Sequence, residues 1–361
     1  MTAATPDTDA KGLTSLVALR DYSAPSGEAV GVLREMFRPE IKSAGNFLDS
    51  VFKRKPKAAA EMFPLSEDEI STLAPEPVGR AYIPELEEAY GSWLDGDKDE
   101  DKTSLKVLVY PPGDMDTAMS FWAQERGLQC VAATDRHTEI ALPRDGSAIV
   151  VPALHKHFLR QVGGLNVLMK FLVSLMDHNG KVLLGCNSWA WSYLKAAANV
   201  ESLLPFPEAF KPLDAEAMQA WLHVSGANVV LHDRQSQRDT FKDLSIRSQG
   251  IPSVAWQMWR QGLRQETDGT VVLSVVPDLR GLPDDQRQAR LVLQALLVHG
   301  GLKTAELNSL MPFGTAAEMA VALERRGYVD ISGSVVSVCP LAYPTVRSLL
   351  LTAGFNSDDL S

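Results

Sequence analysis

Short apolar runs alternate with amphipathic stretches between Ser104 and Ala198. An apolar run of roughly four to eight residues is typical of a buried strand, and a longer stretch with helical periodicity is typical of a helix. The pattern predicts strands over 105–110, 130–133, 148–151 and 181–186 and helices over 117–126, 158–177 and 189–197. Strands that alternate with helices pair in parallel through crossover helices, so the predicted fold class is α/β.

From Asp214 onward the pattern is helical. Asp214 is an N-cap candidate for a helix over 214–223, and a Gly-Ile-Pro turn precedes a helix over 253–263. We therefore expect a helical lid over 213–283. The remaining residues, 284–361, predict helices over 288–298, 303–310 and 315–326, then Gly327 and two short strands around Gly333. That order is typical of a winged helix-turn-helix.

The first 57 residues form a separate region of the sequence. Residues 1–27 are rich in Thr, Ala, Asp, Ser and Pro and predict an irregular arm. The following amphipathic helical segment ends in aromatic and basic side chains, namely Phe47, Phe52, Lys53, Arg54, Lys55 and Lys57. One interpretation is a helix that contacts a partner protein or an anionic membrane through these residues. The other is a helix packed on the main domain with a solvated basic end.

Between this segment and the α/β region lies a stretch without a clear period. Residues 58–103 contain several prolines and close with the acidic run Asp95–Asp101. Both features are typical of connecting segments and solvated turns. We therefore expect a connector over 58–103 and an α/β core over 104–212.

Composition narrows the class of protein. The chain has 361 residues, of which 45% are hydrophobic and 22% charged, as expected for a folded protein of two or three domains. A net charge of −10 disfavours non-specific binding to nucleic-acid backbones.

The three cysteines, far apart in apolar surroundings, predict buried thiols in a reducing compartment. Because no secretion signal and no run of about 18 apolar residues occurs, we expect a cytoplasmic protein, with attachment to the inner face of a membrane as an open alternative.

The turn after the strand over 105–110 has the layout of a phosphate-binding loop. The segment VLVYPPGDMDTAMSFWAQERGL resembles the strand, P-loop and helix of AAA+ and related P-loop ATPases. In the register G-x-x-x-x-G-K-[ST], Tyr110 stands at the first glycine, Met115 at the second and Asp116 at the lysine, while Thr117 agrees. The resemblance implies a P-loop-NTPase-like parallel sheet with a helical lid and a C-terminal winged helix.

These replacements remove the chemistry that a phosphate loop needs. The lysine supplies positive charge to the β and γ phosphates, and the glycine lets backbone N–H groups surround the anion. Asp116 would instead repel a triphosphate by on the order of 1 to 4 kcal/mol at about 4 Å. The resemblance implies a degenerate nucleotide pocket at this turn, to which Pro112, Gly113 and Thr117 would contribute. Hydrolysis of ATP at this turn is therefore not expected.

The segment after the strand over 148–151 should supply acidic residues for magnesium and for the attacking water. Pro152, Ala153, Leu154 and His155 follow instead. Without a carboxylate the metal has no protein ligand and the water has no base. We interpret His155 and His157 as residues at a helix start or rim, because no third metal ligand accompanies them. No catalytic residue and no metal site is assigned.

Two further segments resemble AAA+ elements. KVLLGCNSW resembles a strand that ends in a polar sensor residue, which implies that role for Asn187. The alternative for Asn187 is the N-cap of the helix over 189–197. SIRSQGIPSVAWQMWRQGL resembles a lid segment, in which Arg247 would sense phosphate or else be an ordinary solvated arginine.

The third helix of the predicted winged helix has few groups that read bases. Arg325 and Arg326 lie at its C-terminal end, while Glu318 and Glu324 carry opposite charge. Base readout in the major groove needs Arg, Lys, Asn or Gln along one face. We therefore favour a protein contact or intramolecular packing over DNA binding for this helix and do not expect nucleic acid as a partner.

These observations predict a catalytically inactive AAA+-like protein, a pseudo-ATPase, that serves as an adaptor, scaffold or regulator through protein–protein contacts. Its partner would be an active ATPase or a second copy of itself, and no cofactor is expected. One alternative is a residual ATP- or ADP-binding protein or ATPase, in which Arg247 or a cation of another subunit replaces the lysine. Another is a winged-helix DNA-binding regulator that uses Arg325 and Arg326.

Overall fold

The computed structural model describes residues 14–25, 62–75, 82–96, 104–132, 136, 142–143, 146–224, 234–267, 271–273, 279, 281–356, 358 and 360. The chain divides into two compact units. The first unit comprises residues 1–23, 77–212 and 277–361, and the second comprises residues 24–76 and 213–276. The candidate connector over 58–103 is thus shared between the two units, and the basic segment from Phe47 to Lys57 lies outside the described residues.

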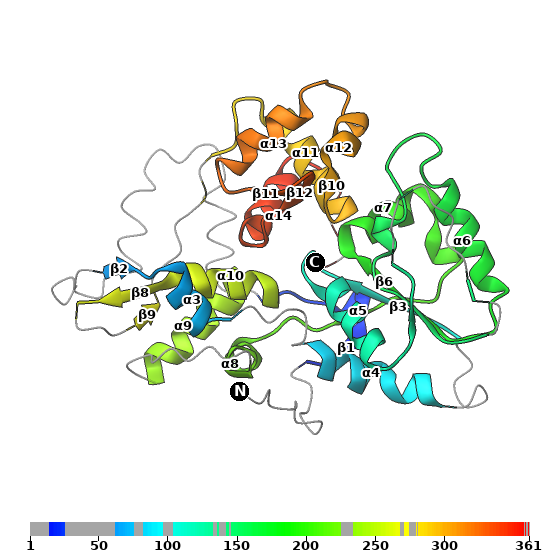
Figure 1. The fold of residues 1–361 in the computed structure, drawn as a ribbon, viewed down its shortest axis with the longest axis horizontal. Coiled ribbons are helices and arrows are strands. Elements are labelled where there is room, and N and C mark those ends of the chain that lie inside the picture. Colours follow the sequence, from blue (N-terminus) through cyan, green and yellow to red (C-terminus); the bar gives the residue numbers. More distant parts are fainter. Residues whose placement is uncertain are drawn as a thin grey trace. The chain divides into compact units, whose positions relative to one another are not determined.

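A six-stranded sheet in the order β1-β7-β3-β6-β5-β4 forms the centre of the first unit (Figure 1). Its strands are β1 (Leu16–Ala18), β3 (Leu105–Tyr110), β4 (Gln129–Cys130), β5 (Ile149–Val151), β6 (Val182–Asn187) and β7 (Glu208–Phe210). All neighbouring pairs are parallel except β1 with β7. The mostly parallel α/β sheet that the sequence predicted is therefore confirmed.

One face of this sheet packs against two helices, α4 (Ile83–Asp95) and α5 (Met115–Glu125). Alternate residues of β3 point to this face and join one apolar cluster with both helices, because successive side chains of a strand point to opposite faces. Its members from these three elements include Leu86, Tyr90 and Trp93 of α4, Leu108 and Tyr110 of β3, and Met119 and Trp122 of α5. This packing fixes the start of α5 beside the end of β3.

The other face of the sheet is covered by α7 (Ser188–Ala198), which contacts β3 and β6. Trp189, Trp191 and Leu194 of this helix are buried. A further helix, α6 (Asn166–Met176), links β5 to β6 and buries Leu168, Phe171, Leu172 and Leu175. The sheet is thus buried on both faces, as expected for parallel strands.

Three elements differ from the sequence-based expectation. The helix predicted over 158–177 begins only at Asn166, because Gly163 has a φ of +74° and residues before it form turns and the short 3-10 helix η3 (Leu154–Lys156). The presumed connector contains α4, in which Pro84 lies in the first turn, where a proline is tolerated. The predicted irregular arm contains β1, whose order comes from pairing with β7 within the same chain.

The C-terminal part of the first unit has the element order of a winged helix. The elements are α11 (Gln286–His299), β10 (Leu302–Lys303), α12 (Thr304–Leu310), α13 (Ala316–Glu324), β11 (Val329–Ser332), β12 (Val335–Val338) and α14 (Tyr343–Thr352). The three strands form an antiparallel sheet in the order β10-β12-β11. Gly300 and Gly301 have positive φ values of 63° and 104°, which allows the tight turn between α11 and β10.

The second unit contains α8 (Ala215–Val224), α9 (Arg234–Arg247) and α10 (Pro252–Gly262). The helices α8 and α10 match those predicted over 214–223 and 253–263, whereas α9 was not predicted. Asp214 caps α8, because its carboxylate accepts hydrogen bonds from the backbone N–H groups of Glu216 and Ala217. A small antiparallel sheet, absent from the sequence-based expectation, joins β2 (Met62–Pro64), β8 (Leu263–Glu266) and β9 (Val271–Leu273). The helix α3 (Glu67–Leu73) is tied to α10 by the Arg260–Glu67 ion pair at 2.5 Å.

Two broader observations concern the membrane and the thiols. Among the described residues, none of the helices combines the length and the apolar character that a bilayer crossing requires. All three cysteines are free thiols; Cys186 is buried, whereas Cys130 and Cys339 are only partly buried. The expectation of three buried thiols is thus correct for Cys186 alone.

Close packing between β6 and α5 leaves no room for a side chain at Gly185. A Cβ atom there would lie 2.3 Å from the carbonyl oxygen of Pro152 and 2.6 Å from the sulfur of Met119. We expect Gly185→Ala to lower the free energy of unfolding by about 1–3 kcal/mol, because backbone must move. Urea denaturation of the full chain measures this change. The matched control is Gly314→Ala, where no atom lies within 4 Å of the added Cβ, and equal loss in both variants would contradict the packing argument.

Candidate functional site

The turn between β3 and α5 is the part of the chain that corresponds to a phosphate loop. It runs through Pro111, Pro112, Gly113 and Asp114, and α5 begins at Met115. Gly113 is exposed, as is Thr117 in the first turn of α5. The structure therefore brings Pro112, Gly113 and Thr117 together at one helix start, where free backbone N–H groups and the helix dipole favour negative charge.

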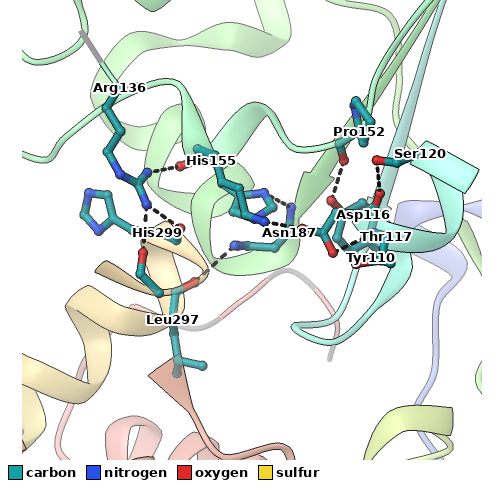
Figure 2. Close-up of polar contacts among 12 residues, drawn as sticks. Tyr110, Asp116, Thr117, Ser120, Arg136, Pro152, His155, Asn187, Leu297 and His299 are labelled. Carbon is teal, nitrogen blue, oxygen red and sulfur yellow. Dashed lines mark hydrogen bonds and ion pairs between the residues drawn. The ribbon is translucent and has the colours of Figure 1, made fainter. Parts of the chain in front are cut away.

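Asp116 supplies that negative charge from within the chain. Its Oδ1 accepts a hydrogen bond from the backbone N–H of Thr117 at 2.9 Å (Figure 2). Its Oδ2 forms an ion pair with the Nζ of Lys156 at 2.5 Å. The Asp116 side chain is only 14% exposed. Lys156 comes from η3, directly after β5. The position of the P-loop lysine thus holds a carboxylate that is already paired with a cation of the neighbouring segment.

Tyr110, at the position of the first P-loop glycine, fills the space beneath the turn. Its side chain is 3% exposed, and its hydroxyl donates to the carbonyl oxygen of Pro152 at 2.6 Å (Figure 2). Its ring contacts the imidazole of His155 edge to face, with centroids 6.2 Å apart. Burial raises the pKa of this phenol well above its ordinary value, and the nearby carboxylate of Asp116 adds to the shift. The phenol therefore stays neutral and ties β3 to the segment after β5.

The segment after β5 holds two buried histidines and no carboxylate. His155 is 3% exposed, and its Nδ1 accepts a hydrogen bond from the backbone N–H of Asn187 at 3.3 Å. Burial, followed by the charges of Lys156 and Arg136, lowers the pKa of His155 well below its ordinary value. His157 stacks on Phe171, and burial lowers its pKa to about 4. Of the predicted helix-start or rim positions, the rim is wrong, because both rings are buried and neutral. His155 lies in the short 3-10 helix η3 and His157 directly follows it.

Metal coordination finds no support in these residues. Within the part of the chain that the structure describes, no group of three or more His, Cys, Asp or Glu side chains could hold a metal ion. A neutral imidazole can ligate a metal, but a site needs several convergent ligands. In the structure, His155 accepts a hydrogen bond from the backbone of Asn187, whereas His157 packs on Phe171.

Asn187 is the N-cap of α7, as one of the two sequence interpretations predicted. Its Oδ1 accepts a hydrogen bond from the backbone N–H of Ala190 at 2.7 Å. Its Nδ2 donates to the carbonyl oxygen of Leu297, in the last turn of α11, at 3.1 Å (Figure 2). The side chain is 1% exposed. Both ends of the amide are thus engaged in joining the α/β core to the winged helix.

Arg136 makes the same connection more extensively. Its Nη1 donates to the carbonyl oxygens of His155 at 2.9 Å and Phe158 at 3.3 Å. Its Nη2 donates to those of His299 at 3.1 Å and Gly301 at 2.7 Å (Figure 2). The Nε lies 3.6 Å from the carboxylate of Glu306 in α12, and the guanidinium is 10% exposed. One side chain therefore satisfies carbonyl groups on both sides of the junction.

A third contact across the junction uses His299, the last residue of α11. Its Nδ1 donates to the carbonyl oxygen of Ala295 at 2.7 Å, and its Nε2 accepts from the backbone N–H of Arg160 at 3.0 Å. Burial lowers the pKa of His299 to about 3, and the nearby guanidinium groups of Arg136 and Arg160 contribute. We call Arg136, His155, Asn187 and His299 the core–wing junction. Arg136 and His299 had no signal in the sequence, because neither belongs to a motif.

The remaining candidate residues lie elsewhere. Arg247 ends α9 in the second unit and lies 4.0 Å from the carboxylate of Asp243, one helical turn earlier. Arg247 therefore belongs to a different unit from the β3–α5 turn. Arg325 is exposed after α13, and Arg326 donates to the carbonyl oxygen of Ala322 at 3.3 Å. The candidate contacts from Phe47 to Lys57 lie outside the described residues.

The architecture of the first unit defines its fold class. Counted along the chain from β3, its parallel strands lie in the order fifth, first, fourth, third, second, and a helix begins directly after the first of them. A winged helix follows at the C-terminus. The first unit is therefore an α/β fold with a mostly parallel sheet and a C-terminal winged helix.

Comparison with known proteins gives structural neighbours of low identity. They include Orc1 of Aeropyrum pernix in complex with DNA (15% identity, TM-score 0.37, 79% of this chain and 97% of that chain), the RuvB Holliday junction branch migration motor of Thermotoga maritima (13%, 0.35, 81% and 98%), and Cdc6p of Pyrobaculum aerophilum (11%, 0.34, 82% and 100%). No model of a protein family and no curated protein matches the chain.

Arg136 should hold the winged helix on the core. In Arg136→Lys the charge is kept, but an ammonium group cannot reach carbonyls on both sides at once. We expect the free energy of unfolding to fall by about 2–3 kcal/mol, since hydrogen bonds to a charged group are lost and carbonyls stay buried. Hydrogen exchange of the amides in residues 296–303 should accelerate. The control is Arg325→Lys, an exposed position, and unchanged exchange in Arg136→Lys would contradict the assigned role.

The low pKa of His299 predicts a pH dependence of stability. The folded pKa of about 3 lies below the unfolded value of 6.5, so the unfolded chain binds more protons in acid. The contribution is complete above pH 6.5 and decreases as the pH falls toward the folded pKa. Between pH 7 and pH 5 the loss is about 2 kcal/mol for this histidine. Urea denaturation at pH 7 and at pH 5 measures this effect. Between these pH values the free energy of unfolding should fall by about 2 kcal/mol less in His299→Gln than in the unaltered chain. An equal fall in both chains would contradict the assignment.

Proposed function

We propose that this chain is a catalytically silent AAA+-like module, a pseudo-ATPase, that acts as an adaptor, scaffold or regulator through protein–protein contacts. The observation that carries the proposal is the ion pair between Asp116 and Lys156 at the start of α5. In a P-loop ATPase this place is reserved for phosphate oxygens and a lysine. Here the helix start already has a carboxylate, and its countercharge comes from the segment that should carry acidic residues.

The physical cost of placing a nucleotide there is high. A triphosphate would approach the carboxylate of Asp116 and compete with it for Lys156 and for the N–H of Thr117. Like charges about 4 Å apart repel by on the order of 1 to 4 kcal/mol when the effective dielectric constant is about 80 to 20. Tyr110 also brings a bulky ring, held by Pro152, to a position where the loop normally needs glycine.

The groups that would activate water are also committed to structure. Asn187, the candidate sensor, uses its Oδ1 for Ala190 and its Nδ2 for Leu297. His155 is buried and neutral and accepts a bond from the backbone of Asn187. A general base has to reach its water directly or through one intermediate. These side chains serve the core–wing junction instead.

The exposed face of α13 supports protein contacts over DNA contacts. Glu318, Val321 and Glu324 are exposed at successive turns of this helix, followed by Arg325. Carboxylates on this face repel phosphate, whereas mixed acidic and apolar surface suits a basic protein segment. A winged helix held firmly on the α/β core would present this surface in a fixed orientation to a partner, such as an active ATPase or a second copy of the chain.

Calorimetric titration of the full chain with ATP and ADP, with and without magnesium, tests the proposal. We expect no saturable heat up to millimolar nucleotide, because the helix start is occupied by the Asp116–Lys156 pair. Asp116→Asn removes the carboxylate while keeping the size of the side chain, and it serves to show whether repulsion alone prevents binding. Magnesium-dependent binding in the micromolar range that is lost in Thr117→Ala would overturn the proposal in favour of a nucleotide-binding protein.

A further inference from the structure

The end of the chain folds back into the first unit. After α14 the backbone turns at Gly354, whose φ is +78°, and Asn356 is exposed. Two residues further on, Asp358 is fully buried, and Leu360 is 3% exposed. A buried carboxylate so near a chain end needs specific partners, because desolvation of an unpaired charge is costly.

Three donors satisfy the carboxylate of Asp358. Its Oδ2 accepts from the hydroxyl of Tyr343 at 2.8 Å and from that of Ser188 at 3.1 Å. Its Oδ1 accepts from the Nε of Arg347 at 2.8 Å. The same guanidinium donates through Nη2 to the backbone carbonyl of Leu360 at 2.7 Å. One arginine therefore recognises both a side-chain carboxylate and the backbone two residues later.

The donors belong to two different parts of the first unit. Ser188 begins α7 of the α/β core, whereas Tyr343 and Arg347 belong to α14, after the winged-helix strands. The Nε1 of Trp189 also donates to the hydroxyl of Tyr343, at 3.3 Å, so that the two helices remain joined beside the carboxylate. The carboxylate of Asp358 lies at the N-terminus of α7, where the helix dipole favours an anion.

We propose that Ser188, Trp189, Tyr343 and Arg347 form a peptide-binding site, the tail socket, whose ligand is an acidic Asp-x-Leu segment. In this structure the ligand is the C-terminal segment of the same chain, through Asp358 and Leu360. The proposal does not depend on the nucleotide pocket. It adds to the proposed adaptor function a binding site for acidic Asp-x-Leu segments.

The chemistry of the socket supports a ligand that can leave and return. The Arg347 side chain is 12% exposed, and its Nε and Nη2 would remain as unpaired donors in the socket after the tail has left. A buried cation without its carboxylate strongly favours rebinding of one. The tail is held as an intramolecular ligand, so its high effective concentration keeps the socket filled until the chain is cut or displaced.

Cleavage after folding tests the socket without disturbing the folding of the chain. A protease recognition sequence is inserted between Phe355 and Asn356, the purified folded protein is cut, and the released segment is removed. A fluorescent synthetic peptide of residues 354–361 is then titrated and followed by anisotropy. We expect saturable binding to the cut protein and none to the uncut protein, because the uncut socket is occupied.

Matched variants separate recognition of Asp358 from general affinity. The peptide with Asp358→Asn should bind at least tenfold more weakly, whereas the peptide with Asn356→Ala, altered at an exposed position, should bind as the original does. In the protein, Tyr343→Phe should weaken binding severalfold by removing one donor, and Arg325→Gln should not. These variants are read in cut protein that retains its thermal unfolding transition.

Three results would overturn the proposal. They are no saturable binding to folded, cut protein, equal binding of the original and Asp358→Asn peptides, and equal binding to cut and uncut protein. If the cut protein loses its unfolding transition, the original peptide is titrated into the uncut Asp358→Asn chain instead. Failure of the peptide to bind to that chain would also overturn the proposal. Binding that appears together with dimers of the cut or uncut Asp358→Asn chain would support exchange of tails between copies.

Discussion

The C-terminal end of α11 presents backbone carbonyl groups that no residue of the helix can satisfy, and the first unit is arranged around the donors that satisfy them. The last carbonyls of a helix need partners from outside it. Asn187 supplies one to Leu297, and Arg136 supplies others to His299 and Gly301. Because Asn187 caps α7 and Arg136 also bonds to the segment after β5, the same donors position the core. The winged helix is therefore an integral part of the first unit.

This arrangement gives a physical meaning to the altered phosphate turn. In an active P-loop ATPase, the residues at the carboxyl ends of the parallel strands must stay available to nucleotide, metal and water. In this chain the corresponding positions bond to one another: Tyr110 to Pro152, Asp116 to Lys156, and His155 to Asn187. Under the proposed function, groups that would serve a ligand in a P-loop ATPase serve the fold in this chain.

The sequence predicted those elements whose signal is local. The strands β3 and β6 were placed within one residue, because parallel strands buried on both faces are continuous apolar runs. The cap at Asn187 followed from its position before a helix. The helix over 158–177 was predicted too long, because Phe158 and Leu159 are apolar for another reason: they are buried, and Phe158 packs on Tyr193 and His299. The contacts of Arg136 and of Asp358 join residues distant in sequence and have no local signal.

The pairing of β1 with β7 has a consequence for the whole sheet. An unpaired edge strand exposes N–H and C=O groups that can recruit a strand of another chain. Here the N-terminal residues Leu16–Ala18 cover the β7 edge, and the opposite edge consists of β4, which has only two residues. The sheet therefore ends in two very short edge strands, β1 with three residues and β4 with two, which offer little backbone to a strand of another chain. A chain trimmed to begin at Gly27 would keep its phosphate turn and its winged helix, yet β7 would become the edge strand and expose the backbone groups that now pair with β1.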